Sequence, residues 1–248
     1  DLKPGKIGEL AVGKQGYERL LRNHFLNYSV DELVTIGTKL YKETEQLMQH
    51  TAAQIDSNKT WQQLIEENRM DHMDPWNLYT DLAREAARAK VLVYEEIVSV
   101  PDGVIEEYRY VRRAHPETIP RGASGIGPFG FTHNDRYVGY YSLPSIDQYN
   151  TWPRKSEFLQ DWSRAWYIAQ QIPHEVYPGH HFAIFMTGKN QRPARQLAGS
   201  APYTDVSSTM SEGWAVYAEE LMYNHGYLND EPRLFLGHLQ HRLWRIAR

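Results

Sequence analysis

His174–His181 has the sequence HEVYPGHH, which places three histidines and one glutamate in eight residues. A second acidic segment, Ser211–Trp214, follows with the sequence SEGW. Imidazole and carboxylate groups are two of the common kinds of zinc ligand in proteins, and the chain has no cysteine to supply a thiolate. The two segments therefore predict a metal site, provided that the fold brings them together.

The spacing of these histidines is not that of a regular zinc-binding helix, in which two histidines four residues apart share one face. His174 and His180 would diverge by about 120° on an ideal helix, and His181 would lie about 10 Å from His174 along the helix axis. Pro178-Gly179 resolves the conflict, because proline removes a helical hydrogen bond and glycine permits unusual backbone angles. We therefore predict a broken helix that brings His180, rather than His181, to a metal ion beside His174.

Three glutamates complete the predicted site. Glu212 is expected in the first turn of a helix that starts near Met210, where it would be the third protein ligand of one zinc ion. Glu175 is predicted to be the general base that takes a proton from the attacking water. Glu219 lies two turns beyond Glu212 on the same helix face, so it would orient a ligand histidine by a hydrogen bond. His181 is predicted to lie behind the ligands or to contact the substrate.

The bulk composition is that of an ordinary globular protein. The chain has 248 residues, a net charge of −4 and no cysteine, so disulfides, thiolate zinc sites and cysteine nucleophiles are excluded. The lack of a basic excess argues against nucleic acid as a partner. No apolar run approaches the roughly 20 residues that a membrane span needs. The composition does not predict an oligomeric state.

The two ends of the chain suggest that it belongs to something longer. The chain begins at Asp1 and ends at Arg248, inside an expected helix. We therefore expect a processed product or a fragment, whose active-site residues need not suffice for turnover. A signal sequence removed in processing would fit a periplasmic or secreted location, which we favour over a cytoplasmic one.

The spacing of apolar residues predicts a mainly α fold with a small β element before the metal-binding helix. One domain would contain a helical part at 1–100, a part of loops and strands at 101–153, and the metal-site helices at 154–248. In the first part, a capping box at Ser29–Glu32 begins one long helix. Asp74-Pro75 is expected to begin another, with the aspartate as N-cap and the proline in the first turn.

The middle part is expected to contain two strands. Val104–Val111 and Tyr137–Leu143 are rich in residues that favour strands. Between them, Gly125–Gly130 has the sequence GIGPFG, which fits the dinucleotide-binding pattern GxGxxG. Because Pro128 lies inside this segment and no helix is expected after it, we reject nucleotide binding and predict a plain loop.

Helices are expected again in the last part. A helix rich in tryptophan is predicted from about Ser156 to Gln171, interrupted or restarted by Pro173, since proline is tolerated only in a first turn. The helix that carries the acidic segment is expected to end at Gly226. A last helix is expected to run to the end of the chain, and its two histidines, His238 and His241, are interpreted as surface residues.

The two motifs together resemble the domain-of-unknown-function 885 family. The matching residues are His-Glu-x-x-Pro-Gly-His-His at 174–181 and Glu-Gly-Trp-Ala-x-Tyr-Ala-Glu at 212–219. The family is regarded as bacterial gluzincin-type metallopeptidases, so the resemblance implies a zincin-like domain and zinc-dependent peptide hydrolysis. By analogy with gluzincins, Tyr137–Ser142 is expected to be an edge strand that pairs with an extended peptide. Family members are near twice this length, and the proline directly before the first motif is unusual.

The sequence is therefore interpreted as a zinc metallopeptidase domain whose substrate is a peptide. Tyr140 or Tyr141 is a candidate to help hold the oxyanion during hydrolysis. Three alternatives stay open at this point. The first is a metal-dependent hydrolase of another amide or ester. The second is a catalytically incomplete domain that binds peptide or metal, and the third is a purely structural helical domain.

Overall fold

The fold is mainly helical with one small sheet, as the sequence predicts. The computed structural model describes residues 12–74, 76–100, 105–112, 125–133, 136–143, 163–189 and 205–247. Before the sheet lie α1 (Gly13–Asn23), α2 (Val30–Ile55), α3 (Trp61–Met70), α4 (Leu78–Leu92) and the π-helix η2 (Val93–Ile97). After it lie α7 (Arg164–Trp166), the π-helix η4 (Tyr167–Val176), α8 (His180–Lys189), α10 (Asp205–Asn224) and α11 (Pro232–Ala247). In these ranges, no helix combines the length and the apolar character that a membrane crossing requires.

The predicted capping box is confirmed at the start of α2. The Ser29 hydroxyl accepts a hydrogen bond from the Glu32 backbone N–H at 3.2 Å, and the Glu32 carboxylate accepts one from the Ser29 backbone N–H at 2.8 Å. Each side chain thus satisfies a backbone donor that the first helical turn leaves unpaired.

The predicted start of α4 is wrong by one turn. The helix begins at Leu78 with Asn77 as its N-cap residue, rather than with Asp74. The Asp74 carboxylate instead accepts a hydrogen bond from the Trp76 backbone N–H at 3.0 Å. Such a bond closes a local turn, which delays the helix.

The sheet has three strands in the order β1–β3–β2. They are β1 (Ile105–Arg112), β2 (Gly125–His133) and β3 (Arg136–Leu143). β1 runs parallel to β3, whereas β2 is antiparallel to β3. The two strands predicted at 104–111 and 137–143 are therefore confirmed.

Two predictions for the sheet are wrong. The segment predicted as a loop, Gly125–Gly130, is the first part of β2, and its register shifts between Gly127 and Phe131. A proline cannot donate a ladder hydrogen bond, so Pro128 is accommodated where the pairing is irregular. The expected edge strand at Tyr137–Ser142 lies in β3, the middle strand, so both of its edges are already paired.

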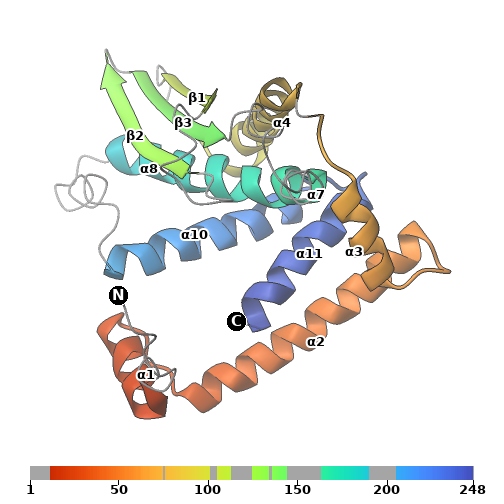
Figure 1. The fold of residues 1–248 in the computed structure, drawn as a ribbon. Coiled ribbons are helices and arrows are strands. Elements are labelled where there is room, and N and C mark those ends of the chain that lie inside the picture. Colours follow the sequence, from red (N-terminus) through yellow and green to blue (C-terminus); the bar gives the residue numbers. More distant parts are fainter. Residues whose placement is uncertain are drawn as a thin grey trace, which may run out of the picture.

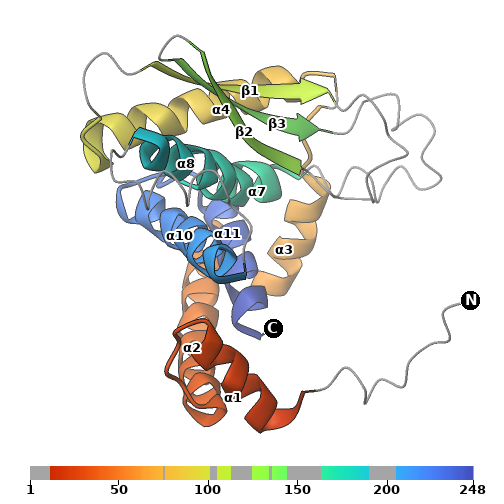
Figure 2. The same cartoon turned by 90° about the vertical axis from the view of Figure 1, so that its left-hand side faces the viewer.

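The segment from η4 to α8 forms the centre of the molecule. The sheet lies on one side of it, and α10 and α11 lie on the other (Figures 1 and 2). A large core joins η4 and α8 to α4 and α10, and its buried members include Leu82, Ile168, Ile172, Phe185 and Met222. This packing places the motif at 174–181, which spans η4 and α8, beside the motif at 211–214 on α10.

A second core holds the long helix α2 in place. α2 lies against α11 and α3 (Figure 1), with Met48, Leu64, Leu236 and Leu239 buried between them. Because α11 packs on α2 and also on α7 and η4, more than one of its faces is covered.

Pro173 does not interrupt its helix, contrary to the prediction. It lies inside the π-helix η4, which continues to Val176. At the end of η4 the Tyr177 backbone N–H bonds to the Ile172 carbonyl at 3.1 Å, the five-residue spacing of a π-helix. The wider turn accommodates a proline that an α-helix interior would not. The predicted stretch from Ser156 to 162 lies outside the described residues.

The helix α10 begins earlier than predicted. Its first residue is Asp205 rather than a residue near Met210, so Glu212 lies past the first turn. α10 ends at Asn224, and Gly226 has a φ of 89°. This left-handed conformation, which glycine adopts without strain, is the predicted stop signal.

Candidate metal centre

The predicted break in the motif helix is confirmed. η4 ends at Val176, α8 begins at His180, and the Tyr177–Pro178 peptide bond between them is cis. Gly179 packs so tightly that a Cβ atom there would overlap the His174 carbonyl oxygen. The indole N–H of Trp214 donates a hydrogen bond to the Pro178 carbonyl at 2.9 Å, which ties the break to α10.

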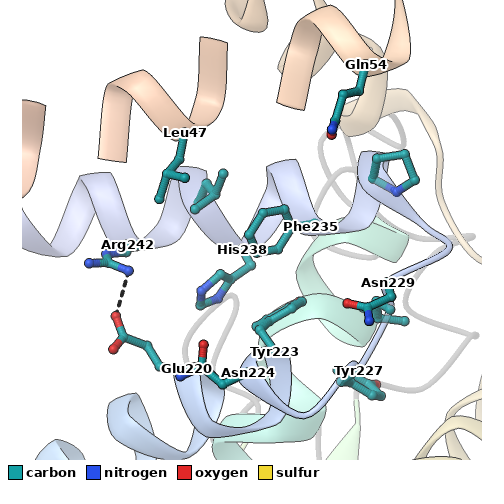
Figure 3. A pocket seen from close by; sticks show the side chains of 13 residues that line it. Leu47, Gln54, Glu220, Tyr223, Asn224, Tyr227, Asn229, Phe235, His238 and Arg242 are labelled. Atoms are coloured by element: carbon teal, nitrogen blue, oxygen red, sulfur yellow. Dashed lines mark ion pairs between the residues drawn. The ribbon is translucent and has the colours of Figure 1, made fainter. Parts of the chain in front are cut away.

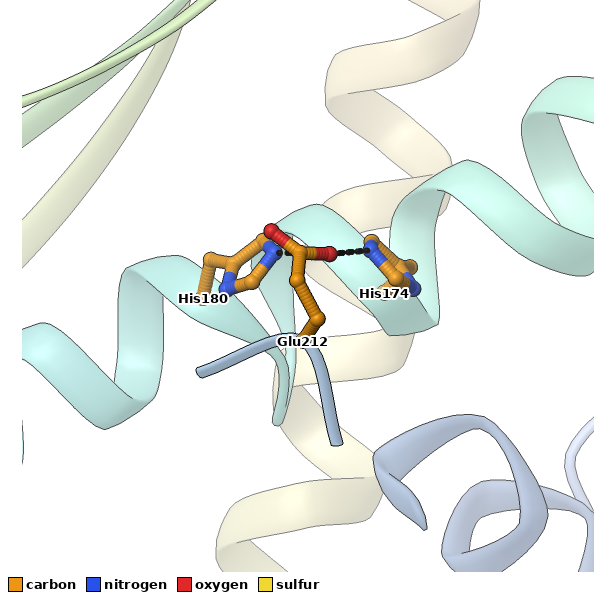
Figure 4. A group of neighbouring side chains, drawn as sticks. All are labelled: His174, His180 and Glu212. Carbon is orange, nitrogen blue, oxygen red and sulfur yellow. Dashed lines mark ion pairs between the residues drawn. The ribbon is translucent and has the colours of Figure 1, made fainter. Parts of the chain in front are cut away.

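The break brings three of the predicted residues together. The Nε2 atoms of His174 and His180 lie 3.4 and 3.5 Å from Glu212 Oε2 (Figure 4). Within the described part of the chain, one ligand atom from each of the three residues lies within 4.8 Å of the others. Tetrahedral zinc with ligands at about 2.1 Å places neighbouring ligand atoms about 3.4 Å apart. The two distances to Glu212 therefore fit a zinc ion with little rearrangement.

The second nitrogen of each imidazole has a partner of its own. His174 Nδ1 bonds to Glu219 Oε1 at 2.6 Å, and His180 Nδ1 bonds to Ser211 Oγ at 3.2 Å. With Nδ1 bonded in this way, the Nε2 atom of each ring points towards Glu212. Metal-binding histidines in proteins are commonly oriented by such hydrogen bonds from their other ring nitrogen. Glu219 thus bonds to a ligand histidine, as the sequence predicts. The contact of Ser211 with His180 was not predicted, because a serine beside a ligand glutamate has no distinctive spacing.

The electrostatics of the cluster favour a positive charge at its centre. Hydrogen bonds from His174 and His180 hold the pKa of Glu212 well below its ordinary value. Burial alone would lower the pKa of His174, but its hydrogen bonds with Glu212 and Glu219 outweigh burial and raise this pKa to about 9. A divalent cation bound at Nε2 would take the place of the imidazole proton that faces Glu212, while the Nδ1–H of His174 would still donate to Glu219.

Glu175 lies beside the cluster, and one of its carboxylate oxygens has no hydrogen-bond partner. Its Oε2 is buried without a hydrogen bond and lies 4.0 Å from His180 Nε2. Burial raises the pKa of Glu175 to about 7. A buried polar atom without a hydrogen-bond partner is costly, and this one lies beside the His180 nitrogen that would bind a metal ion. The donor set and this oxygen together fit a catalytic metal site.

His181 points away from the cluster. Its Nε2 bonds to Glu106 Oε2 on β1 at 2.6 Å, and its ring contacts Tyr108 edge-on with centroids 4.7 Å apart. Gly139 on β3 lies so close to the imidazole that a Cβ atom there would overlap it. His181 therefore connects the motif to the sheet.

Glu106, the carboxylate at the centre of this connection, was not predicted from the sequence. Its side chain is fully buried and accepts hydrogen bonds from the hydroxyls of Tyr94 and Tyr177, each at 2.8 Å. The Lys90 ammonium forms an ion pair with the same carboxylate. No local pattern marks Glu106, because its donors come from η2, α4 and the motif.

Tyr140 and Tyr141 lie on β3, where they pair in register with Arg109 and Tyr110 of β1. The structure describes their backbone, and their side chains lie outside what it describes. Their suggested contact with an oxyanion therefore stays a prediction.

The histidines of α11 differ from their predicted exposure. His238 is only 3% exposed, so its interpretation as a surface residue is wrong. α11 is covered on several faces, and the His238 ring packs against Tyr223 with centroids 4.2 Å apart. His241 is half-buried against the Trp166 ring.

Comparison with known proteins adds a family and a fold. A family model with the description "Bacterial protein of unknown function (DUF885)" matches residues 2–248. Two similar solved structures are a candidate lipoprotein from Colwellia psychrerythraea and a candidate lipoprotein of unknown function from Shewanella oneidensis, each with a TM-score of 0.70 and 18% identity. The matches cover 96% and 95% of this chain but 38% and 42% of those proteins, so the chain spans less than half their length. No curated protein matches the chain.

At 18% identity, the two solved structures establish a shared fold alone. The family model is more informative, because it matches the chain from its second residue to its last and so includes both histidine and glutamate motifs. This chain belongs to the DUF885 family of bacterial proteins.

Proposed function

We propose that this chain carries the metal centre of a zinc-dependent peptidase. The supporting observation is the convergence of two imidazole Nε2 atoms on Glu212, beside a buried oxygen of Glu175 that has no hydrogen-bond partner. His174, His180 and Glu212 would hold one zinc ion and leave a position open, as catalytic zinc sites do. A zinc ion bound there would polarise the scissile carbonyl and make the attacking water more acidic.

Glu175 would be the general base of the reaction. A group whose pKa lies near neutral pH can both accept and return a proton, and burial raises the pKa of Glu175 to about 7. Its carboxylate would take a proton from the attacking water and then deliver it to the leaving amine. Glu219 and Ser211 would hold the two imidazole rings in place during these steps.

Metal analysis of four proteins tests the proposal. The wild-type chain should bind one zinc ion, as measured by elemental analysis and by calorimetric titration. His174→Ala and Glu212→Gln should bind zinc far more weakly, because each removes a ligand. Glu175→Gln should retain zinc and lose peptide hydrolysis. If the wild type binds no stoichiometric zinc and His174→Ala changes nothing, the chain is a structural domain and the proposal is wrong.

A substrate panel separates the peptidase from its alternatives. Quenched fluorescent peptides, simple esters and non-peptide amides would be compared with zinc-loaded wild-type protein. Turnover of peptides, lost in Glu175→Gln, supports the proposal. Turnover of esters or amides alone would replace the peptidase with another metal-dependent hydrolase. Zinc binding without turnover of any class would indicate a binding domain.

We also propose that the protein works outside the cytoplasm. The support is that both similar solved structures are described as candidate lipoproteins. Fractionation of the source cells, followed by immunodetection of the protein, tests this location. Recovery in the cytoplasmic fraction alone would contradict it.

A further inference from the structure

The two carboxylate oxygens of Glu219 contact different groups. Its carboxylate is fully buried, and Oε1 accepts the hydrogen bond from His174 Nδ1 at 2.6 Å. The other oxygen, Oε2, accepts a hydrogen bond from Arg245 Nη1, also at 2.6 Å. Arg245 lies in the last turn of α11. The carboxylate therefore bridges a predicted metal ligand and an arginine from a different helix.

A second residue of α11 lies near the same oxygen. His238 Nδ1 is 3.6 Å from Glu219 Oε2, which is beyond hydrogen-bond distance, and it has no hydrogen-bond partner. His238 also lines a cavity of about 350 Å³ between α2, α10 and α11 (Figure 3). His238 thus makes a longer contact with Oε2, and Arg245 is the partner that donates a hydrogen bond to this oxygen.

The physical role of Arg245 follows from burial. A buried carboxylate oxygen that loses its charged partner carries a large desolvation cost. Glu219 would relieve that cost by rotating towards another donor, and Oε1 would then leave the position that holds the His174 ring. The guanidinium, which is always protonated and forms short charge-assisted bonds, would oppose this rotation.

We propose that Arg245 is a positioning residue of the metal centre, which fixes Glu219 so that the His174 ring presents Nε2 to the metal. This inference rests on the proposed zinc site. It assigns α11 a part in metal binding, although α11 supplies no ligand. Arg245 acts through Glu219, to which it donates its hydrogen bond.

The chain provides a matched control for Arg245. Arg242 of α11 pairs with Glu220 of α10 at 2.7 Å, so the same two helices are joined by a second arginine–glutamate pair. Glu220 is 42% exposed in its side chain and neighbours Glu219 in sequence. Figure 3 shows this pair at the edge of the cavity. A loss that reflects weakened helix packing should therefore appear in Arg242→Met as well.

Zinc titration of the full chain is the first measurement. Arg245→Met should weaken zinc binding about tenfold, the lower end of the range for loss of an outer partner, whereas Arg242→Met should change it by less than about twofold. Arg245→Lys retains the charge without the planar guanidinium and should recover part of the affinity. In a Glu219→Gln background, Arg245→Met should have little further effect, because the two residues act in one chain of contacts.

The second measurement reports on the His174 ring itself. In protein with ¹⁵N-labelled histidine, the proton on His174 Nδ1 should give a signal assigned by its loss in His174→Ala. Arg245→Met should shift this signal, and Arg242→Met should not. Circular dichroism and urea unfolding establish that each variant is folded. If Arg245→Met is unfolded, Arg245→Lys decides the question by the same two measurements.

The outcomes separate this inference from the proposed function. Absence of zinc binding by the wild type would overturn the proposed function, and the inference with it. Zinc binding by the wild type with unchanged affinity and an unchanged His174 signal in folded Arg245 variants would overturn the inference alone. Equal losses in Arg245→Met and Arg242→Met would overturn it too, because they would indicate helix packing rather than positioning.

Discussion

Glu106 and His181 are hydrogen-bonded at 2.6 Å between the sheet and the metal-binding motif, although they lie 75 residues apart in sequence. On the other side of the helix break, His174 bonds at 2.6 Å to Glu219, which belongs to α10. Both carboxylate side chains are fully buried. The two segments that flank the break are therefore each held by a carboxylate from a different element.

The Glu106 anchor should be important for stability. Glu106→Ala would leave Lys90 and three hydrogen-bond donors without their shared acceptor. Removing one partner of a buried charged network costs about 3–5 kcal/mol, so we expect a loss of about 3 kcal/mol in the free energy of unfolding. Urea denaturation measures this loss. Glu96→Gln, a change at an exposed carboxylate on η2, is the control and should stay within about 0.5 kcal/mol of wild type. Equal stability of both variants would contradict the prediction.

The same carboxylate predicts how stability depends on pH. Burial opposes ionisation of Glu106, but hydrogen bonds from His181, Lys90 and Tyr177 outweigh it and lower its pKa from 4.5 to about 2. Tyr94 also donates to this carboxylate. Because the unfolded state binds the proton more readily, the contribution of Glu106 is complete above about pH 5 and is lost as the pH falls towards 2.

The size of this pH dependence follows from the lowered pKa of Glu106. The difference between its pKa in the unfolded and folded states corresponds to about 3 kcal/mol in the free energy of unfolding. Urea unfolding at a series of pH values between 2 and 6 measures it, and Glu106→Gln should flatten the curve over this range. A variant curve with the same slope as the wild-type curve would show that other groups cause the dependence.

Gly179 should tolerate no side chain. A Cβ atom at this position would overlap the His174 carbonyl oxygen and would also lie 2.5 Å from the Pro173 carbonyl oxygen. Gly179→Ala should therefore force the break open, lower the free energy of unfolding by several kcal/mol and abolish zinc binding. Gly213→Ala is the matched control, because nothing lies within 4 Å of its added Cβ. In a helix it should stabilise the protein by up to about 1 kcal/mol. A thermal melt of both variants measures the difference, and a wild-type melt for Gly179→Ala would refute the prediction.

The two outer partners of the histidines should not contribute equally. Glu219→Ala removes a buried carboxylate, and Ser211→Ala removes a neutral hydroxyl that is 3.2 Å from His180 Nδ1. Hydrogen bonds to charged groups are roughly twice as strong as neutral ones. We therefore expect Glu219→Ala to weaken zinc binding by about 10- to 100-fold and Ser211→Ala by several-fold. Competition with a chromophoric chelator measures both affinities, and the opposite ranking would contradict this assignment.

Much of the fold was predictable because its signals are local. The capping box at Ser29 marks the start of α2, and Gly226 follows the end of α10 in the left-handed conformation that glycine favours. The strands β1 and β3 have the residue types of strands. The errors lie where tertiary contacts outweigh local preference. Gly125–Gly130 joins a sheet through pairing with β3, and Pro173 lies in a π-helix surrounded by the core.

The candidate site divides in the same way. The sequence by itself determined the residues that converge, because Pro178 and Gly179 fix where the motif helix breaks and the break decides between His180 and His181. Only the tertiary structure decided what holds them. Glu106, Ser211 and Arg245 act across packed elements, and a hydrogen bond between residues that are distant in sequence leaves no spacing or periodicity from which it could be predicted.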